Sequence, residues 1–316
     1  MPQPSKRRRQ ELAASRNTSS KRASAPLPDR YRPRRVTVSR PWWRSPGALI
    51  GGTAGAVIAV VVIFIVLADL GSSSASAPIS PLPIASDSVV SAVTGVTTQV
   101  SDTVGSGGIS NPLQALPATA AKLTGADGNP EVFYLGAEFC PFCAAERWSV
   151  VVALSRFGTF TDLRLLTSSS TDNYPNTHTF SFYGSSYSSQ YLDFVPLETA
   201  TRTQGQTLQT PTDAQDVLIE TYDTSPYSST TGGIPFQDLA NRYILSGSGT
   251  NPEILQGMDW QQIADTLSST QSQVAQEIIG NANWITAGIC KVTGNQPGSV
   301  CNGAPISTLE AQIASS

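Results

Sequence analysis

A single uncharged stretch divides the chain and constrains every other assignment. Residues 45–68 include no charged residue, and the apolar centre of the stretch, residues 48–67, is rich in Ala, Val, Ile, Leu and Phe. About 20 helical residues span the hydrocarbon core of a bilayer. Trp42, Trp43 and Arg44 precede the stretch, as residues at a membrane interface do. We therefore predict an uncleaved transmembrane helix over residues 45–68; a buried core helix and a signal peptide processed at Ala75-Ser76-Ala77 are the alternatives.

The charges on the two sides of this stretch have opposite signs. Residues 1–44 hold 13 of the 20 basic residues and two acidic ones, a net charge of +11, whereas the rest of the chain carries −14. Basic flanks stay on the cytoplasmic side of a membrane. We therefore expect a single-pass protein of the cytoplasmic membrane, with its N-terminus inside and its C-terminal domain outside. The basic tail, residues 1–44, is expected to be disordered and to contact the lipid bilayer, with no nucleic-acid partner.

The remaining chain is predicted to be a linker followed by one domain of the α/β class. Residues 69–130 are rich in Ser, Ala, Pro and Gly, with valines at helical spacing between Val89 and Val104 that predict a possible short helix. The extracytoplasmic domain is placed at residues 131–310. A strand over 132–135, a helix over 144–157 and a strand over 163–167 predict a right-handed βαβ unit. Residues 168–230 are predicted to be a β-rich insertion, and two helices, 259–268 and 271–285, to close the domain.

Cys140-Pro141-Phe142-Cys143 lies between the first predicted strand and helix and is the sharpest chemical signal. The first cysteine then lies at a helix N-terminus, where free N–H groups and the macrodipole stabilise a thiolate. Pro141 suits the first helical position, which needs no N–H donor. A second thiol at this spacing can attack a mixed disulfide formed at the first. We therefore expect Cys140 to be the exposed nucleophile and Cys143 the buried resolving thiol; an inert disulfide and a metal site are the alternatives.

The other two cysteines, Cys290 and Cys301, bracket a turn-rich loop. All four cysteines follow the predicted anchor, and thiols outside the cytoplasm are normally oxidised, so two disulfides are expected. A structural Cys290–Cys301 disulfide is worth about 3 kcal/mol for a loop of this length. The alternative is a second redox pair that passes electrons to Cys143. His178 is the one histidine, which excludes a multi-histidine site, and neither a metal nor a cofactor is expected.

The segment around Cys140 resembles the thioredoxin superfamily, with Phe139 where that family usually has Trp. It is more similar to a thioredoxin-like family of archaea and actinobacteria named only as domain of unknown function 929. Three stretches, residues 136–148, 153–158 and 174–177, carry this likeness, which extends over about residues 84–310. The resemblance implies a thioredoxin-like domain with a β-rich insertion, but it supplies no biochemical role.

Two more expectations follow from the thioredoxin resemblance. Those proteins set a cis-proline loop opposite the cysteine pair, and the residue before the proline pairs through its backbone with the substrate. Ile234-Pro235 fits that position, so we expect a cis bond there and a role in the substrate groove. The buried acid that thioredoxins carry six positions before the first cysteine is Tyr134 here. Glu138 and Glu146 are the candidates to replace it, although we expect Glu138 to be a solvated loop charge.

The sequence thus predicts a membrane-anchored extracytoplasmic thiol–disulfide oxidoreductase. Its partners would be extracytoplasmic protein thiols or disulfides and an unidentified membrane redox protein that resets the cysteine pair. The alternative is a non-catalytic cell-envelope binding or scaffolding module with two structural disulfides. An exposed Cys140 sulfur beside a cis Pro235 favours the enzyme, and low solvent access at Cys140 favours the scaffold.

Overall fold

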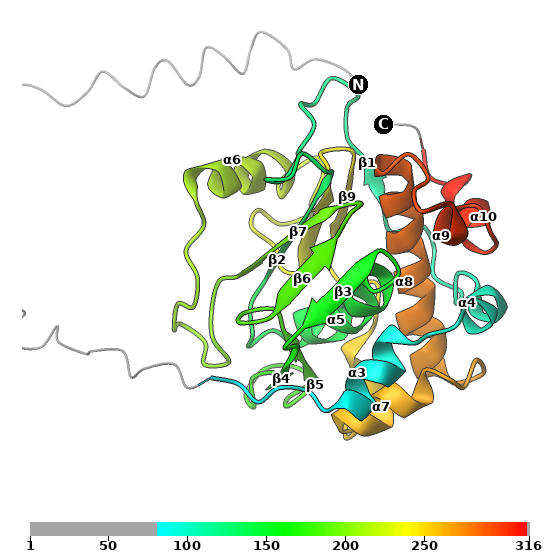
Figure 1. The fold of residues 1–316 in the computed structure, drawn as a ribbon. Coiled ribbons are helices and arrows are strands. Elements are labelled where there is room, and N and C mark those ends of the chain that lie inside the picture. Colours follow the sequence, from blue (N-terminus) through cyan, green and yellow to red (C-terminus); the bar gives the residue numbers. More distant parts are fainter. Residues whose placement is uncertain (1–80, 315–316) are drawn as a thin grey trace, which may run out of the picture. The chain divides into compact units, whose positions relative to one another are not determined.

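The computed structural model describes residues 81–314, in which strands and helices form a mixed α/β fold (Figure 1). The basic tail and the predicted transmembrane segment lie outside the described residues. Within residues 81–314, no helix combines the length and the apolar character needed to cross a membrane.

A five-stranded sheet in the order β1-β9-β8-β2-β7 forms the centre of this fold. Its strands are β1 (Gln114–Ala115), β2 (Glu131–Gly136), β7 (Asp193–Glu198), β8 (Phe236–Leu239) and β9 (Tyr243–Ser246). β2 is parallel to β7 and antiparallel to β8. Successive side chains of a strand point to opposite faces. Val132 and Tyr134 accordingly join the larger core cluster and Phe133 and Leu135 the smaller one, which explains why β2 is apolar throughout.

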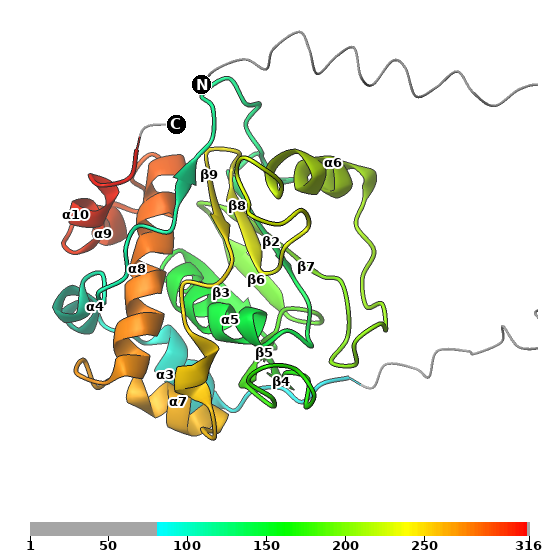
Figure 2. The same ribbon diagram turned by 180° about the vertical axis from the view of Figure 1, so that it is seen from behind.

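Helices cover the face that Val132 and Tyr134 occupy. α5 (Pro141–Leu154) and α8 (Gln273–Val292) pack side by side there (Figure 2). The shorter helices of this layer are α3 (Asp87–Thr94), α4 (Thr98–Val104), the 3₁₀ helix Pro252–Leu255, α7 (Trp260–Thr266), α9 (Gly298–Cys301) and α10 (Ile306–Glu310). On the other face, α6 (Asp213–Tyr222) contributes Leu218 to the smaller cluster. The sheet is therefore buried on both sides.

The folded unit begins well before residue 131, where the sequence analysis placed the start of the domain. Val89 and Val93 of α3 are buried in the larger cluster. Farther along, the Asn283 side chain of α8 donates hydrogen bonds to the carbonyls of Ser101 and Gly105, at 3.0 and 2.7 Å. The valine spacing correctly predicted helix, but it produces an apolar stripe that packs on the domain. This part of the predicted linker therefore belongs to the core.

Two small antiparallel ladders stand apart from the main sheet. β3 (Gly158–Thr161) pairs with β6 (Ser186–Ser189), and β4 (Arg164–Thr167) pairs with β5 (His178–Ser181). The predicted strand at 163–167 therefore forms, but it is not the parallel partner of β2. That partner is β7, which the sequence analysis had included in the insertion at 168–230. A short apolar run shows that a strand forms but not which strand it pairs with, so the insertion was drawn too long.

Gly280 offers a test of the contact between α8 and the segment after α4. A Cβ atom on Gly280 would overlap the Ser106 carbonyl oxygen and approach the Gly107 Cα to 2.9 Å. Gly→Ala inside a helix normally stabilises by about 1 kcal/mol. Here we expect Gly280→Ala to destabilise the protein by about 1–3 kcal/mol, because the backbone must move. Urea unfolding measures the change, and Gly303→Ala, where a Cβ would meet nothing within 4 Å, is the matched control. A stabilised Gly280→Ala protein would contradict this packing.

Candidate active site around the Cys140–Cys143 pair

Cys140 is the N-cap of α5, directly after the turn that follows β2. Its backbone is extended (φ −76°, ψ 122°), Pro141 begins the helix, and the Cys143 N–H donates to Cys140 Sγ at 3.3 Å. A sulfur atom thus satisfies one of the N–H groups that a helix leaves free at its first turn. The two cysteines are therefore adjacent thiols in this structure. The disulfide expected at this pair is not found, since both cysteines are free.

The two thiols differ in their environments. The pKa of Cys140 is lowered, first by a hydrogen bond from the Cys143 side chain and further by the Cys143 N–H and the charge of Arg147, against an opposing effect of burial. Burial raises the pKa of Cys143 well above its ordinary value. Cys140 is only 6 % exposed, however, and Cys143 is fully buried. The expectation of an exposed Cys140 is therefore wrong, whereas Cys143 is buried as expected.

A segment of the β-rich insertion lies against the cysteine turn. The Ser169 N–H donates to the Phe139 carbonyl at 2.9 Å, and the ring of Tyr174 meets that of Phe142 edge to face at 5.9 Å. Phe142 is nevertheless 42 % exposed, one of the few large apolar side chains that face solvent in residues 81–314. The site thus combines a covered sulfur with an exposed aromatic ring beside it.

A buried ion pair lies next to the cysteines, and the sequence analysis missed it. Arg147 donates from Nε and Nη2 to the two carboxylate oxygens of Glu198, at 2.8 and 2.6 Å, and both side chains are fully buried. Arg147 Nη2 also donates to the Ala137 carbonyl at 2.9 Å. Its Nη1 atom is buried and has no partner in the described residues. Arg147 follows Cys143 by four residues, hence by one helical turn, and this spacing is a signal that could have revealed it.

Tyr134, which stands at the position where the thioredoxin resemblance implies an acid, is fully buried in β2. Its ring lies 5.9 Å from the Arg147 guanidinium carbon, and its buried hydroxyl has no hydrogen-bond partner in the described residues. Burial raises the pKa of Tyr134 well above its ordinary value. Tyr134 is therefore a neutral group, unsuited to accept a proton from Cys143.

Both candidate replacements for that acid are buried. Glu138 is 4 % exposed and accepts a hydrogen bond from Ser181 Oγ at 2.7 Å, so the expectation of a solvated loop charge is wrong. The loop is covered by β5, which sequence spacing did not reveal. Burial raises the pKa of Glu138.

Glu146 is fully buried one turn after Cys143. Its carboxylate accepts hydrogen bonds from four groups: Gln237 Nε2 at 2.7 Å, the Gly249 N–H at 2.9 Å, Asn281 Nδ2 at 2.9 Å and Ser248 Oγ at 3.1 Å. Burial nevertheless raises its pKa. Glu146 therefore ties α5 to β8 and α8.

Ile234 and Pro235 lie at the same edge of the sheet as the cysteine turn. β8 begins at Phe236, which pairs with Leu135 near the end of β2. The Ile234–Pro235 bond is cis, as expected. The Pro235 carbonyl accepts the Gly247 N–H at 2.9 Å, whereas the Ile234 N–H and carbonyl make no hydrogen bond within residues 81–314. The Ile234 backbone is thus free to pair with another chain.

The expected Cys290–Cys301 disulfide is present and links α8 to α9. This disulfide lies at the opposite end of β2 from the Cys140–Cys143 pair. Lys291 and Val292, just after Cys290, line a hollow with Pro130, which precedes β2, whereas Cys140 follows the opposite end of β2. Six residues of strand span roughly 20 Å. Direct electron transfer to Cys143, the alternative role, is therefore not favoured. In residues 81–314, no three His, Cys, Asp or Glu side chains gather as a metal site requires.

A family model described as "Domain of unknown function (DUF929)" matches residues 120–291, more than half of the chain. The chain belongs to the DUF929 family. The match covers Cys140, Cys143, Ile234 and Pro235 and ends before Cys301, so it is shorter at both ends than the likeness drawn from the sequence. No curated protein and no solved structure matches the chain. The family is thus established and its biochemical role is open.

The ion pair of this DUF929 protein provides a test of the thiol environment. Removing the Glu198 charge leaves the Arg147 cation uncompensated, so we expect Glu198→Gln to lower the pKa of Cys140 by roughly one pH unit. Because only the thiolate reacts, the curve of alkylation rate against pH should shift to lower pH, followed by mass spectrometry of the modified peptide.

Glu138→Gln is the matched control for this prediction. It also removes a buried carboxyl group, but that group accepts a hydrogen bond from Ser181 and makes none with Arg147. Its alkylation curve should stay near that of the unmodified protein. Equal shifts in the two variants would mean that the ion pair does not set the acidity of Cys140.

Proposed function

We propose that this protein is a membrane-anchored thiol–disulfide oxidoreductase that acts on extracytoplasmic proteins. One observation carries the proposal: Cys140 caps the N-terminus of α5 and its sulfur accepts the Cys143 N–H, whereas Cys143 is fully buried inside the helix's first turn. These surroundings lower the pKa of Cys140 and raise that of Cys143. A structural pair needs no such difference, whereas an attacking thiol and a resolving thiol do.

The exchange reaction uses the two thiols in turn. The Cys140 thiolate attacks one sulfur of a substrate disulfide, a new S–S bond forms, and the other substrate sulfur leaves as a thiolate. Cys143 then loses its proton and attacks Cys140 Sγ, which forms the Cys140–Cys143 disulfide and releases the second substrate sulfur. Two electrons pass from the protein to the substrate, and the reverse sequence oxidises a dithiol. The Arg147 cation favours both protein thiolates, which supports each step.

We further propose that the α/β domain is thioredoxin-like. β2, α5 and β7 provide a parallel strand–helix–strand unit, and the β8–β9 hairpin and α8 follow it. The cysteine pair starts the first helix, and Pro235 precedes the hairpin at the same edge of the sheet. The free Ile234 backbone and the exposed Phe142 ring would contact the substrate peptide, one through hydrogen bonds and one through apolar contact.

The proposed location rests on the sequence. The uncharged stretch at residues 45–68 would anchor the chain, and the basic tail would keep the N-terminus in the cytoplasm. The domain would then face an oxidising compartment and need a membrane redox partner that resets the pair.

The scaffolding module is the second candidate, and the low exposure of Cys140 favours it. The Cys140 side chain is 6 % exposed, and the Ser169 N–H donates a hydrogen bond to the carbonyl of Phe139, the residue before Cys140. Such low solvent access is what a non-catalytic module predicts. The position of Cys140 at the N-terminus of α5 outweighs this point, because the Cys143 N–H and the Arg147 charge stabilise its thiolate in spite of the burial. Substrate access would then require the segment around Ser169 to move.

Trapping of a mixed disulfide separates the two functions. We expect Cys143→Ser to retain a substrate or glutathione on Cys140, visible by mass spectrometry and released by a reductant, because the resolving thiol is missing. Cys140→Ser should retain none. The reduction potential of the unaltered protein should fall between about −120 and −270 mV. No trapped species, with a potential below about −300 mV, would establish the structural role.

A further inference from the structure

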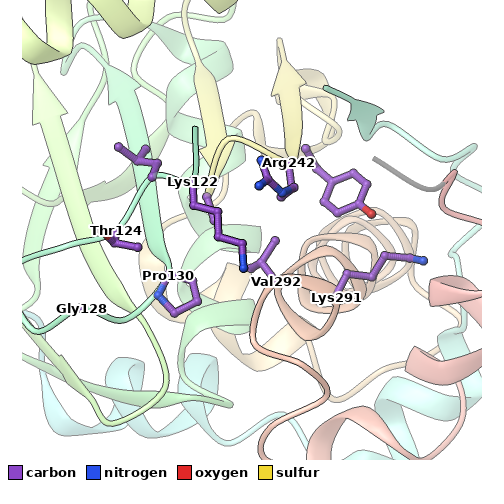
Figure 3. A pocket seen from close by; sticks show the side chains of 10 residues that line it. Lys122, Thr124, Gly128, Pro130, Arg242, Lys291 and Val292 are labelled. Carbon is purple, nitrogen blue, oxygen red and sulfur yellow. The ribbon is translucent and has the colours of Figure 1, made fainter. Parts of the chain in front are cut away.

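A hollow of about 370 Å³ lies at the edge of the sheet opposite the cysteine turn (Figure 3). Pro130, just before β2, and Arg242, just before β9, line it together with the end of α8. Its size lies at the lower end of the range for small-molecule sites. It is therefore large enough for a small ligand or a head group, and it is independent of the thiol chemistry.

The hollow gathers the scarce positive charge of an acidic domain. The described residues include seven Lys and Arg against 20 Asp and Glu. Three of the seven cations, Lys122, Arg242 and Lys291, line the hollow, and none of its lining residues is acidic. Of the remaining four, Arg147 and Arg156 are engaged in the interior. Because its lining carries three cations and no acid, the hollow has a positive potential and attracts an anion.

These cations are available to a ligand. Within residues 81–314, the side-chain amines of Lys122 and Lys291 form no hydrogen bond or ion pair. Arg242 donates from Nη1 to the Ala120 and Asn241 carbonyls, at 3.0 and 2.7 Å, which fixes one side of its guanidinium and leaves the other donors free. In Figure 3, the amino end of Lys122 points into the hollow toward Val292, Arg242 lies across from it, and the amino end of Lys291 points away. Lys122 and Arg242 therefore line the hollow, and the amine of the third cation points away from it.

The wall that carries Lys122 is tied to the sheet. The Leu123 N–H donates to the Ala240 carbonyl at 3.2 Å, and the Leu123 carbonyl accepts the Glu131 N–H at 3.1 Å. Farther along the wall, the Asp127 N–H donates to Asp193 Oδ2 at 3.3 Å. Tyr243, 3 % exposed, forms part of the floor. The site is therefore preformed.

The charge of Arg242 interacts with one buried acid, Asp238. Burial raises the pKa of Asp238 to about 7, while the Arg242 charge acts to lower it. A carboxyl group with this pKa is partly protonated near neutral pH, so it neutralises Arg242 only in part.

We propose that this hollow binds the phosphate group of a small phosphoester. The guanidinium of Arg242 and the Lys122 amine suit phosphate oxygens, and their two charges match a phosphate dianion better than a single carboxylate. The phosphate has two possible sources, a free phosphorylated compound and the head group of a membrane phospholipid.

Calorimetric titration of the full chain in a nonionic detergent, in 150 mM chloride, tests the site with two probes. They are inorganic phosphate and dihexanoyl phosphatidylglycerol, kept below its micelle concentration. We expect saturable binding of at least one probe. Tighter binding of inorganic phosphate assigns a free compound, and tighter binding of the lipid assigns a head group.

Variants of single cations distinguish the hollow from a cation elsewhere in the domain. Lys122→Gln should weaken binding roughly tenfold, because it removes a charge-assisted hydrogen bond. Lys291→Gln should weaken it by roughly threefold or less, since that amine points away and acts through long-range charge. Arg202→Gln, which changes an exposed cation outside the hollow, is the matched control and should leave binding unchanged. All three variants are checked for an unaltered melting temperature. An absence of saturable binding, or equal affinity of Lys122→Gln and the unaltered protein, would overturn the proposal.

Discussion

The structure depends on the pairing of two charges that water cannot reach. An isolated buried charge costs several kcal/mol, so Arg147 must be neutralised where it lies. Glu198 supplies both carboxylate oxygens, and the Ala137 carbonyl takes a further guanidinium hydrogen. These three residues belong to α5, to β7 and to the turn that leads to Cys140. One ion pair thus joins the parallel strand, the first core helix and the cysteine turn, and it fixes the turn relative to both.

This anchoring places two identical side chains in different electrostatic surroundings. Cys140 caps the helix and accepts the Cys143 N–H, so its thiolate gains a donor. Cys143 is enclosed by α5 and the sheet, so its thiolate loses water without gaining the same donor. The Arg147 charge favours both thiolates, but the hydrogen bond from the Cys143 side chain lowers the pKa of Cys140, whereas burial dominates at Cys143 and raises its pKa. The difference between the thiols is therefore a consequence of where a helix starts.

Local patterns predicted the helices and strands of this fold better than they predicted which of them pair or pack together. The apolar run of β2, the turn with Pro141 and the periodic apolar residues of α5 and α8 were each visible in the sequence. The pairing of β2 with β7 was not, because residues 155–192 separate α5 from β7 and include the four strands of the two ladders, which have the same local character. The valine spacing between Val89 and Val104 predicted a helix, but the local pattern did not show whether that helix packs on the domain. The burial of Glu138 depends on Ser181, 43 residues away.

The sequence by itself determined the position of the cysteine pair between a strand and a helix, because capping and apolar periodicity act over a few residues. It also determined the segregation of charge along the chain, which is a matter of composition. Only the tertiary structure decided that Cys140 is covered, that Arg147 meets Glu198 51 residues away, and that Lys122 and Arg242 line one hollow. Each of these outcomes joins segments far apart in the sequence, and a local pattern contains no information on which distant segment will supply the partner.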